Sequence, residues 1–186
     1  MNLEQFNYLN NNLHIEDVDL VDLASTIETP FYVYSSETIK DNCKSYLKNL
    51  STNDLVCYAV KANSNLSILS LIKDEGLGFD VVSGGELKRV IQIGADPRRI
   101  VFSGVGKSKS ELILACEANI FSINVESEYE LNILEEINKS LEYLFELIQT
   151  LQQNLILILK LAKLIVSLVF PKTKHFYLLR NILLII

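Results

Sequence analysis

Residues Val56-Cys57-Tyr58-Ala59-Val60-Lys61-Ala62-Asn63 (VCYAVKAN) place a lysine at the end of an apolar run and a turn-forming Ala-Asn pair directly after it. The run is rich in β-branched, aromatic and small residues, as is typical of a buried strand. An ammonium group at the end of such a strand is paired, desolvated or used in chemistry. The alternative is a surface lysine whose stem lies along apolar residues while its head reaches water.

The same alternation of strand and helix repeats on both sides of this stretch. Short apolar runs alternate with segments of helical spacing, and glycine, serine or proline stands at the junctions. These patterns predict strands at 31–34, 55–60, 79–82, 100–102 and 121–125. The helices predicted after them cover 37–50, 64–74, 86–93 and 128–137, and a further helix is led into by Ser108 or Ser110 and continues through Ala118.

Consecutive strand–helix units predict parallel strands joined by right-handed crossovers. An open doubly wound sheet and a (β/α)8 barrel both have this pattern. The sequence has no G-x-G-x-x-G fingerprint and places glycines at the ends of the later strands, which favours the barrel. The predicted fold class is therefore α/β, a partial (β/α)8 TIM-like barrel of about five βα units followed by an atypical apolar helical tail. The predicted domains are an N-terminal lead-in (1–28), the partial barrel (29–138) and the tail (139–186).

Composition narrows the function class. The chain has 186 residues, 49% of them hydrophobic, with a net charge of -6, so it offers no basic field for nucleic acid. The first residues lack the basic and apolar regions of a secretory signal, and the three cysteines lack C-x-x-C spacing, as expected of a cytoplasmic protein with reduced thiols. His14 and His175 stand alone, so we predict no metal site.

Four motifs follow one another in the first two thirds of the chain: YAVKANSN (58–65), GLGFDVVSGGEL (76–87), IVFSGVGKSKSEL (100–112) and FSINVESEYEL (121–131). In this order they resemble the N-terminal half of the fold-type III pyridoxal-phosphate decarboxylases, most closely the diaminopimelate decarboxylase branch. The resemblance covers roughly residues 13–134. It implies pyridoxal 5'-phosphate as cofactor, an amino acid as small-molecule substrate, and decarboxylation of meso-2,6-diaminopimelate to L-lysine. Family members are homodimeric.

Related families are less similar. Alanine racemases share a lysine motif, but the tyrosine before AVKAN and the later FDVVSGGE favour the decarboxylases. The small one-domain pyridoxal-phosphate carrier proteins differ around the lysine and match VSGGELKRV and FSGVGKS less well. Ornithine, arginine and diaminopimelate decarboxylases differ mainly in residues further along, so the choice of substrate rests on similarity in the first half.

The resemblance also implies the site residues. Lys61 would be the residue whose amine forms the Schiff base with the cofactor. An amine attacks an aldehyde in its neutral form, which desolvation favours, and the apolar strand end is expected to supply a desolvated site. Asp80 and Glu86 would line the cofactor pocket as acidic wall. The structural alternative is a strand-end cap for Asp80 and a first-turn helix acid for Glu86.

The tail departs from the family pattern. Family members continue with a histidine that stacks on the cofactor, a glycine-rich phosphate loop, a Glu-Pro-Gly-Arg segment and a C-terminal β domain. Here all seven glycines lie at or before Gly106, and no acidic residue follows Glu146. We explain the tail by a frameshift near residues 137–140, which predicts an inactive chain. An alternative is a non-catalytic remnant that still binds cofactor.

The tail also has patterns of its own. Apolar side chains recur at helical spacing, at Leu141, Leu144, Leu147, Ile148 and Leu151. Residues 155–170 fall short of the roughly 20 residues that a membrane span needs, and they include Lys160 and Lys163. These two lysines and Ser167 share one helical face, so another alternative is a membrane-associated or partner-binding protein. Dimerisation of this chain is doubtful, because a partial barrel leaves sheet edges open.

Overall fold

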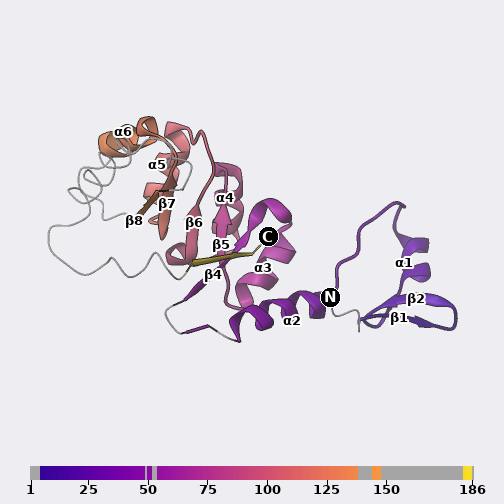
Figure 1. Ribbon diagram of the computed structural model, residues 1–186. Coiled ribbons are helices and arrows are strands. Elements are labelled where there is room, and N and C mark those ends of the chain that lie inside the picture. The colour runs from indigo at the N-terminus through magenta and orange to yellow at the C-terminus, as the bar shows by residue number, and fades with distance from the viewer. Residues whose placement is uncertain (1–4, 49, 52–53, 138–143, 148–181, 186) are drawn as a thin grey trace. The chain divides into compact units, whose positions relative to one another are not determined.

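A computed structural model of the chain describes residues 5–48, 50–51, 54–137, 144–147 and 182–185. The chain divides into two compact units, Met1–Leu50 and Ser51–Ile186, which are described separately below (Figure 1). The first unit carries the lead-in and one long helix, and the second carries the four motifs.

The N-terminal unit begins with an antiparallel meander of three short strands. These are β1 (Phe6–Leu9), β2 (Asn12–Ile15) and β3 (Val18–Asp19). Asn10 and Asn11 join β1 to β2 with φ angles of 52° and 65°, as a tight hairpin turn with two left-handed positions requires. Helices α1 (Leu20–Thr26) and α2 (Ser36–Leu47) follow.

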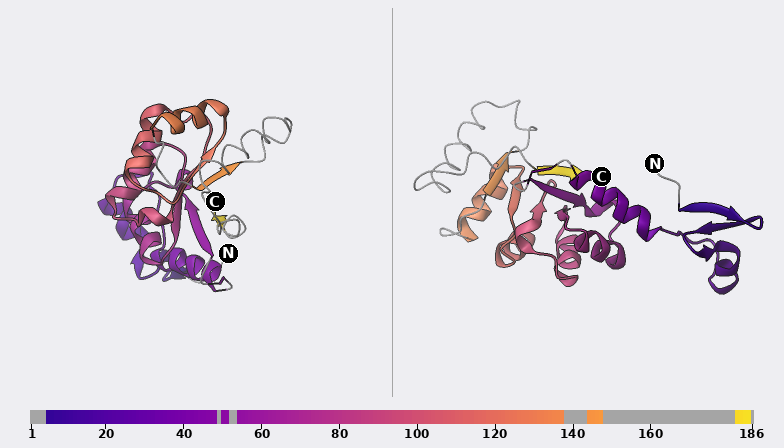
Figure 2. Two further views of the ribbon diagram at one scale, coloured as in Figure 1. Left: turned by 90° about the vertical axis from the view of Figure 1, so that its left-hand side faces the viewer. Right: turned by 90° about the horizontal axis from the view of Figure 1, so that it is seen from below.

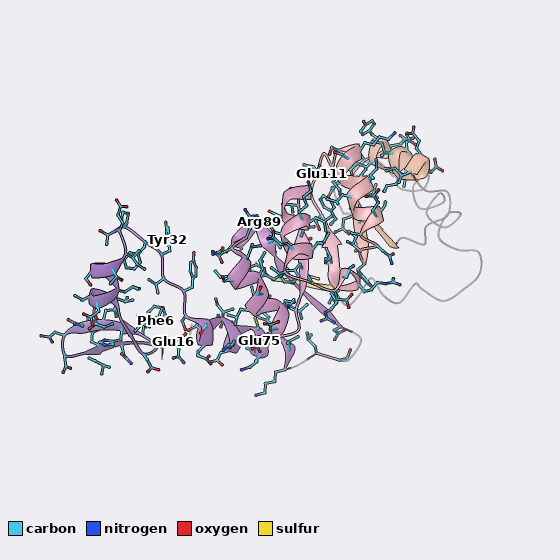
Figure 3. All side chains as sticks on the ribbon, turned by 180° about the vertical axis from the view of Figure 1, so that it is seen from behind. Phe6, Glu16, Tyr32, Glu75, Arg89 and Glu111 are labelled. Atoms are coloured by element: carbon cyan, nitrogen blue, oxygen red, sulfur yellow. The ribbon has the colours of Figure 1, made fainter. Side chains whose placement is uncertain are left out.

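Glu16, labelled in Figure 3, holds the start of α2 within this unit. Its carboxylate accepts hydrogen bonds from the Ser35 hydroxyl at 2.7 Å, the Ser36 hydroxyl at 3.2 Å and the Glu37 amide at 3.0 Å. The hydrogen bond from the Glu37 amide is the largest of the influences that lower the pKa of Glu16 below its ordinary value. Because an ionised carboxylate satisfies free helix amides, this residue stabilises the beginning of α2.

The strand predicted at 31–34 is wrong. These residues have no strand pairing in the described part of the chain, and the Tyr32 side chain is 91% exposed. A β-branched and aromatic run forms a strand only where a neighbour accepts and donates its backbone hydrogen bonds. The helix predicted next is confirmed as α2, and Ser35 is its N-cap.

The second unit is a parallel sheet with a helix after each of four strands. Its elements are β4 (Leu55–Ala59), the 3₁₀ turn η1 (Val60–Ala62), α3 (Leu66–Asp74), β5 (Gly78–Val81), α4 (Gly84–Gln92), the turn η2 (Pro97–Arg99), β6 (Ile100–Phe102), α5 (Lys109–Glu117), β7 (Ser122–Val125), α6 (Glu128–Ile137), β8 (Leu144–Leu147) and β9 (Ile182–Ile185). The strand order is β8-β7-β6-β5-β4-β9, and every pairing is parallel. The predicted partial barrel is confirmed.

Residues 144–147 form a strand beside β7 and not the helix that the spacing of Leu144 and Leu147 suggested. Short apolar segments fit either period, and pairing with an open strand edge decides in favour of β structure here. Ser167, Lys160, Lys163 and the apolar run 155–170 lie outside the described residues. Among the described residues, no helix is long and apolar enough to cross a membrane.

The two faces of the sheet differ in chemistry. Residues paired in register share a face, so Ala59, Asp80, Val101 and Ser122 lie side by side. The opposite face is apolar and consists of Val56, Tyr58, Phe79, Val81, Ile100, Phe102, Ile123 and Val125. Figure 2 shows helices α3 to α6 gathered on one side of β4 to β7.

Lys107 identifies the face that the helices cover. Its Nζ atom lies 6.0 Å from the centre of the Phe102 ring and 2.9 Å from Glu130 of α6. The apolar face therefore meets the helices, where each buried aliphatic or aromatic side chain contributes about 1.5–3 kcal/mol. The face with Asp80 points away from the helices, as the interior face of a barrel does.

Three helices begin with the same four-residue pattern, serine followed three residues later by glutamate. The pairs are Ser83 with Glu86, Ser108 with Glu111, and Ser127 with Glu130. Each serine hydroxyl accepts a hydrogen bond from the amide of its glutamate, at 3.2, 3.4 and 3.2 Å. The sequence pattern is that of a capping box, and both of its reciprocal hydrogen bonds are present at Ser108 and Glu111.

Two of these glutamates also reach the preceding strand–helix unit. Glu111 accepts from the amide of Gly84 at 2.7 Å, and Glu130 accepts from the amide of Lys107 at 3.1 Å as well as from its Nζ atom. A Cβ atom on Gly84 would lie 2.9 Å from Cγ of Glu111, so glycine is needed for this approach. The loops at the carboxyl ends of successive strands are thus linked to one another.

Replacing Glu130 with alanine should lower the free energy of unfolding by about 3–5 kcal/mol, because it removes the partner of a buried lysine. Urea unfolding followed by circular dichroism measures the change. The matched control is Glu136→Ala, which breaks the exposed pair with Lys109 and should have little effect. Equal losses in the two variants would contradict the structural role of the buried pair.

Cys57 should resist alkylation in the folded chain. The residue is buried on the same face as Asp80, and burial, with a further contribution from Asp80, raises the pKa of its thiol to about 12. Since the thiolate is the reacting form, iodoacetamide at pH 8 should label Cys57 in urea and leave it unlabelled without urea, as peptide mass spectrometry measures. Rapid labelling in the absence of urea would contradict the buried position.

Candidate functional site

Lys61 lies at the carboxyl end of β4, in the turn η1, with Val60 fully buried before it. The turn is held by the Tyr58 hydroxyl, which donates to the carbonyl of Asn63 at 3.4 Å. Asn65 then caps α3 by accepting from the Ser67 amide at 2.9 Å. The Ala-Asn pair after the lysine therefore serves the reversal from β4 into α3.

The Lys61 side chain is exposed, so the predicted desolvation of its amine is wrong for the described structure. The reason is local, because the 3₁₀ turn ends the strand and gives the buried position to Val60 instead. An exposed amine at this end of a parallel strand is accessible to a ligand that binds at the strand ends.

Asp80 lies on the neighbouring strand β5, paired in register with Ala59. It is 4% exposed, and its Oδ1 atom accepts a hydrogen bond from the Ser103 hydroxyl. Burial raises the pKa of Asp80, while the bond from Ser103 and the charge of Lys61 oppose the rise and the charge of Glu86 adds to it. The charges of Lys61 and Glu86 thus both act on the Asp80 carboxyl group.

Glu86 stands in the first turn of α4, half-buried. Its Oε2 atom accepts from the amide of Val82 at 2.8 Å, which ties the end of β5 to the start of the helix. This geometry is that of the structural alternative, a first-turn helix acid. The side chain still contributes to the electrostatic environment of Asp80.

Ser103 and Asn124 were missed by the sequence reasoning. Both are buried, and the Asn124 Nδ2 atom donates to Ser103 Oγ at 3.0 Å. Neither Asn124 Oδ1 nor Ser122 Oγ, both buried, has a hydrogen-bond partner in the described part of the chain. A signal existed, since serine and asparagine alternate with apolar residues in the strand 122–125 and therefore share one face.

A groove of about 590 Å³ lies along α4 and α5, and none of the three predicted site residues lines it. Its walls include Gly84, Lys88, Ser108 and Glu111. Figure 3 labels Glu111 on α5 and Arg89 on α4, both in the helical layer. Because the lysine and the buried acid lie at the strand ends, we place the chemistry there and not in this groove.

Comparison with known proteins gives one family. A sequence model of the family described as "Pyridoxal-dependent decarboxylase, pyridoxal binding domain" matches residues 36–158. The matched range includes Lys61, Asp80 and Glu86 and ends within the predicted tail.

Individual relatives agree with the family match. The diaminopimelate decarboxylase of Vibrio cholerae is 45% identical over 137 residues, which are 73% of this chain and 33% of the relative. The crystal structure of AQ1208 from Aquifex aeolicus has a TM-score of 0.69 at 46% identity and covers 72% of this chain and 33% of that one. A diaminopimelate decarboxylase from M. jannaschii in complex with L-lysine has a TM-score of 0.73 at 28% identity, and the match covers 98% of this chain and 46% of that one.

The chain spans about a third of the length of the curated relatives that it matches. The family match, by contrast, covers more than half of the chain and contains the whole series of strand–helix units from β4 to α6. The chain belongs to the pyridoxal-dependent decarboxylases, through the pyridoxal-binding domain of that family.

Proposed function

We propose that the chain provides the lysine-bearing part of the cofactor domain of a diaminopimelate decarboxylase, with Lys61 as the residue that binds pyridoxal phosphate. The observation that carries the proposal is an accessible amine at the end of β4 beside the buried carboxyl group of Asp80 on β5. Support for the substrate, meso-diaminopimelate, comes from relatives with that activity in their names at 41–48% identity. We also propose a cytoplasmic location.

Lys61 and the polar residues on the Asp80 face of the sheet fit the aldehyde end of the cofactor. Lys61 offers a primary amine that solvent and ligands reach, and Asp80 offers an acid whose pKa is raised by burial. The Asn124 Oδ1 atom, which has no partner among the described residues, is a buried acceptor that a donor group of a ligand or a water molecule would satisfy. When bound, pyridoxal phosphate supplies the electron sink that decarboxylation requires.

Each side chain has a separate task in this proposal. Lys61 binds the aldehyde through its amine and, when free of it, exchanges a proton with the reacting carbon. Asp80 orients the amine and balances its charge. Glu86 keeps the loop after β5 in place through the amide of Val82.

The phosphate end of the cofactor needs exposed backbone amides, which glycine-rich loops provide. All seven glycines of the chain lie at or before Gly106, and two of them, Gly104 and Gly106, have φ angles of 92° and 71° in the loop after β6. In that loop the amide of Lys107 is already used, since it donates to Oε1 of Glu130 at 3.1 Å. We therefore propose that the phosphate is held by residues other than those described.

A second candidate function is cofactor binding without turnover. It is favoured by the fact that the chain covers about a third of its curated relatives while retaining the lysine motif. The two functions make the same prediction for Lys61 and differ in whether carbon dioxide is released when the rest of the site is present. Dimerisation with a second chain and contact of the tail with a membrane are further proposals.

Incubation of the full chain with pyridoxal phosphate followed by borohydride reduction should leave a pyridoxyl group on Lys61. Peptide mass spectrometry locates the adduct. Lys61→Ala should abolish it, whereas Lys88→Ala, which removes another exposed lysine of the same unit, should not. Labelling spread evenly over exposed lysines, with none preferred, would contradict the proposed role of Lys61.

The chain alone should release no measurable carbon dioxide from meso-diaminopimelate, because it offers no glycine after Gly106 for a phosphate cradle. A radiometric assay with carboxyl-labelled substrate measures the release, and a full-length relative serves as the positive control. Turnover that depends on Lys61 would refute the second candidate function and support a complete site.

A further inference from the structure

Buried polar side chains from three neighbouring strand segments lie on the interior face near the carboxyl ends of the strands. Asp80 lies on β5, Ser103 follows β6 directly, and Asn124 lies on β7. All three are buried, with exposed fractions of 4%, 9% and 4%. Polar groups on the interior of a sheet cost free energy unless they are hydrogen-bonded, so their alignment is a feature that needs a reason.

The hydrogen bonds among them run in one direction. Ser103 has a single hydroxyl hydrogen, and it donates that hydrogen to Oδ1 of Asp80. The Ser103 oxygen is therefore an acceptor for the Asn124 amide, whose Nδ2 atom lies 3.0 Å away. This order fixes the orientation of the Asn124 amide and leaves its Oδ1 atom without a donor among the described residues.

Asp80 faces few charged groups. Lys61 lowers its pKa and Glu86 raises it, while burial is the largest influence and raises it. Asp80 in turn raises the pKa of the Cys57 thiol on the same face, and the charge of Arg99 lowers it. In the described residues, the Ser103 hydroxyl is the hydrogen-bond donor that holds the Asp80 carboxyl group.

We propose that Ser103 and Asn124 are positioning residues for the cofactor lysine, because their hydrogen bonds hold the Asp80 carboxyl group in one orientation toward the Lys61 amine. The inference rests on the proposed function of Lys61 and adds two residues on β6 and β7 to it. Asn124 acts on Ser103, Ser103 acts on Asp80, and Asp80 acts on the amine. Ser103 and Asn124 each stand two residues beyond Val101 and Ser122, which are in register with Asp80, so the hydrogen bond from Ser103 to Asp80 runs diagonally between neighbouring strands.

The first measurement is an NMR titration of the Asp80 carboxyl carbon in the full chain, without cofactor. Ser103→Ala should move the titration midpoint of Asp80 upward, because the hydrogen bond from Ser103 favours the carboxylate. Asn124→Ala should move it in the same direction by less, and Ser103→Thr, which retains a hydroxyl, should restore it. Lys61→Met should also move the midpoint upward, since the charge of Lys61 opposes protonation of Asp80.

Ser122→Ala is the matched control. Ser122 is buried on the same strand and face as Asn124, but its hydroxyl has no hydrogen-bond partner among the described residues. This variant should leave the Asp80 midpoint unchanged. If Ser103→Ala and Asn124→Ala also leave it unchanged in chains that keep the wild-type circular dichroism spectrum, the positioning role is overturned.

The second measurement is the concentration of pyridoxal phosphate that half-saturates Lys61, read from the borohydride-trapped adduct. Ser103→Ala and Asn124→Ala should each raise this half-saturating concentration roughly three- to tenfold, which is the net contribution of one hydrogen bond. A wild-type chain without an adduct would refute the proposed function of Lys61 while the NMR titration still tests the network. A wild-type adduct with unchanged half-saturation in both variants would refute the positioning inference alone.

Discussion

The parallel register of β4 to β7 is the constraint on which the candidate site depends. Because Ala59, Asp80, Val101 and Ser122 are paired across four strands, Asn124, two residues beyond Ser122, lies on the same face as Asp80. A shift of one residue in any strand would exchange its two faces. It would carry Asp80 into the apolar layer beneath the helices, where neither Ser103 nor Lys61 could reach it.

The register is stabilised from the helical side. Helices α4, α5 and α6 each start with a serine and a glutamate three residues apart, and two of the glutamates accept hydrogen bonds from the preceding unit. These links fix the loops at the carboxyl ends of β5, β6 and β7, which border the Asp80 face. The serine–glutamate spacing therefore caps the start of each helix, and two of its glutamates also link neighbouring site loops.

Much of this arrangement could be predicted from the sequence. The strand at 100–102 and the helix at 128–137 have the predicted bounds, since apolar period and turn residues agree there. Prediction failed at 31–34 and 144–147, where pairing with another strand, or its absence, decides the outcome. The roles of Ser103 and Asn124 depend on register between strands more than 20 residues apart, which local patterns do not encode. The repeated serine–glutamate spacing, by contrast, is a local pattern that marks the starts of α4, α5 and α6.

The contrast between Lys61 and Asp80 bears on how such a site works. The motif predicted a buried amine, yet the structure buries the acid and exposes the amine. An exposed amine keeps its hydration and is free to meet a cofactor, while the buried acid acts on it through a medium of lower polarity than water. Binding of an aldehyde needs only this accessible amine, whereas decarboxylation also needs a fixed phosphate and an oriented ring. Cofactor capture and turnover are therefore separable requirements, and the described residues bear on the first of them.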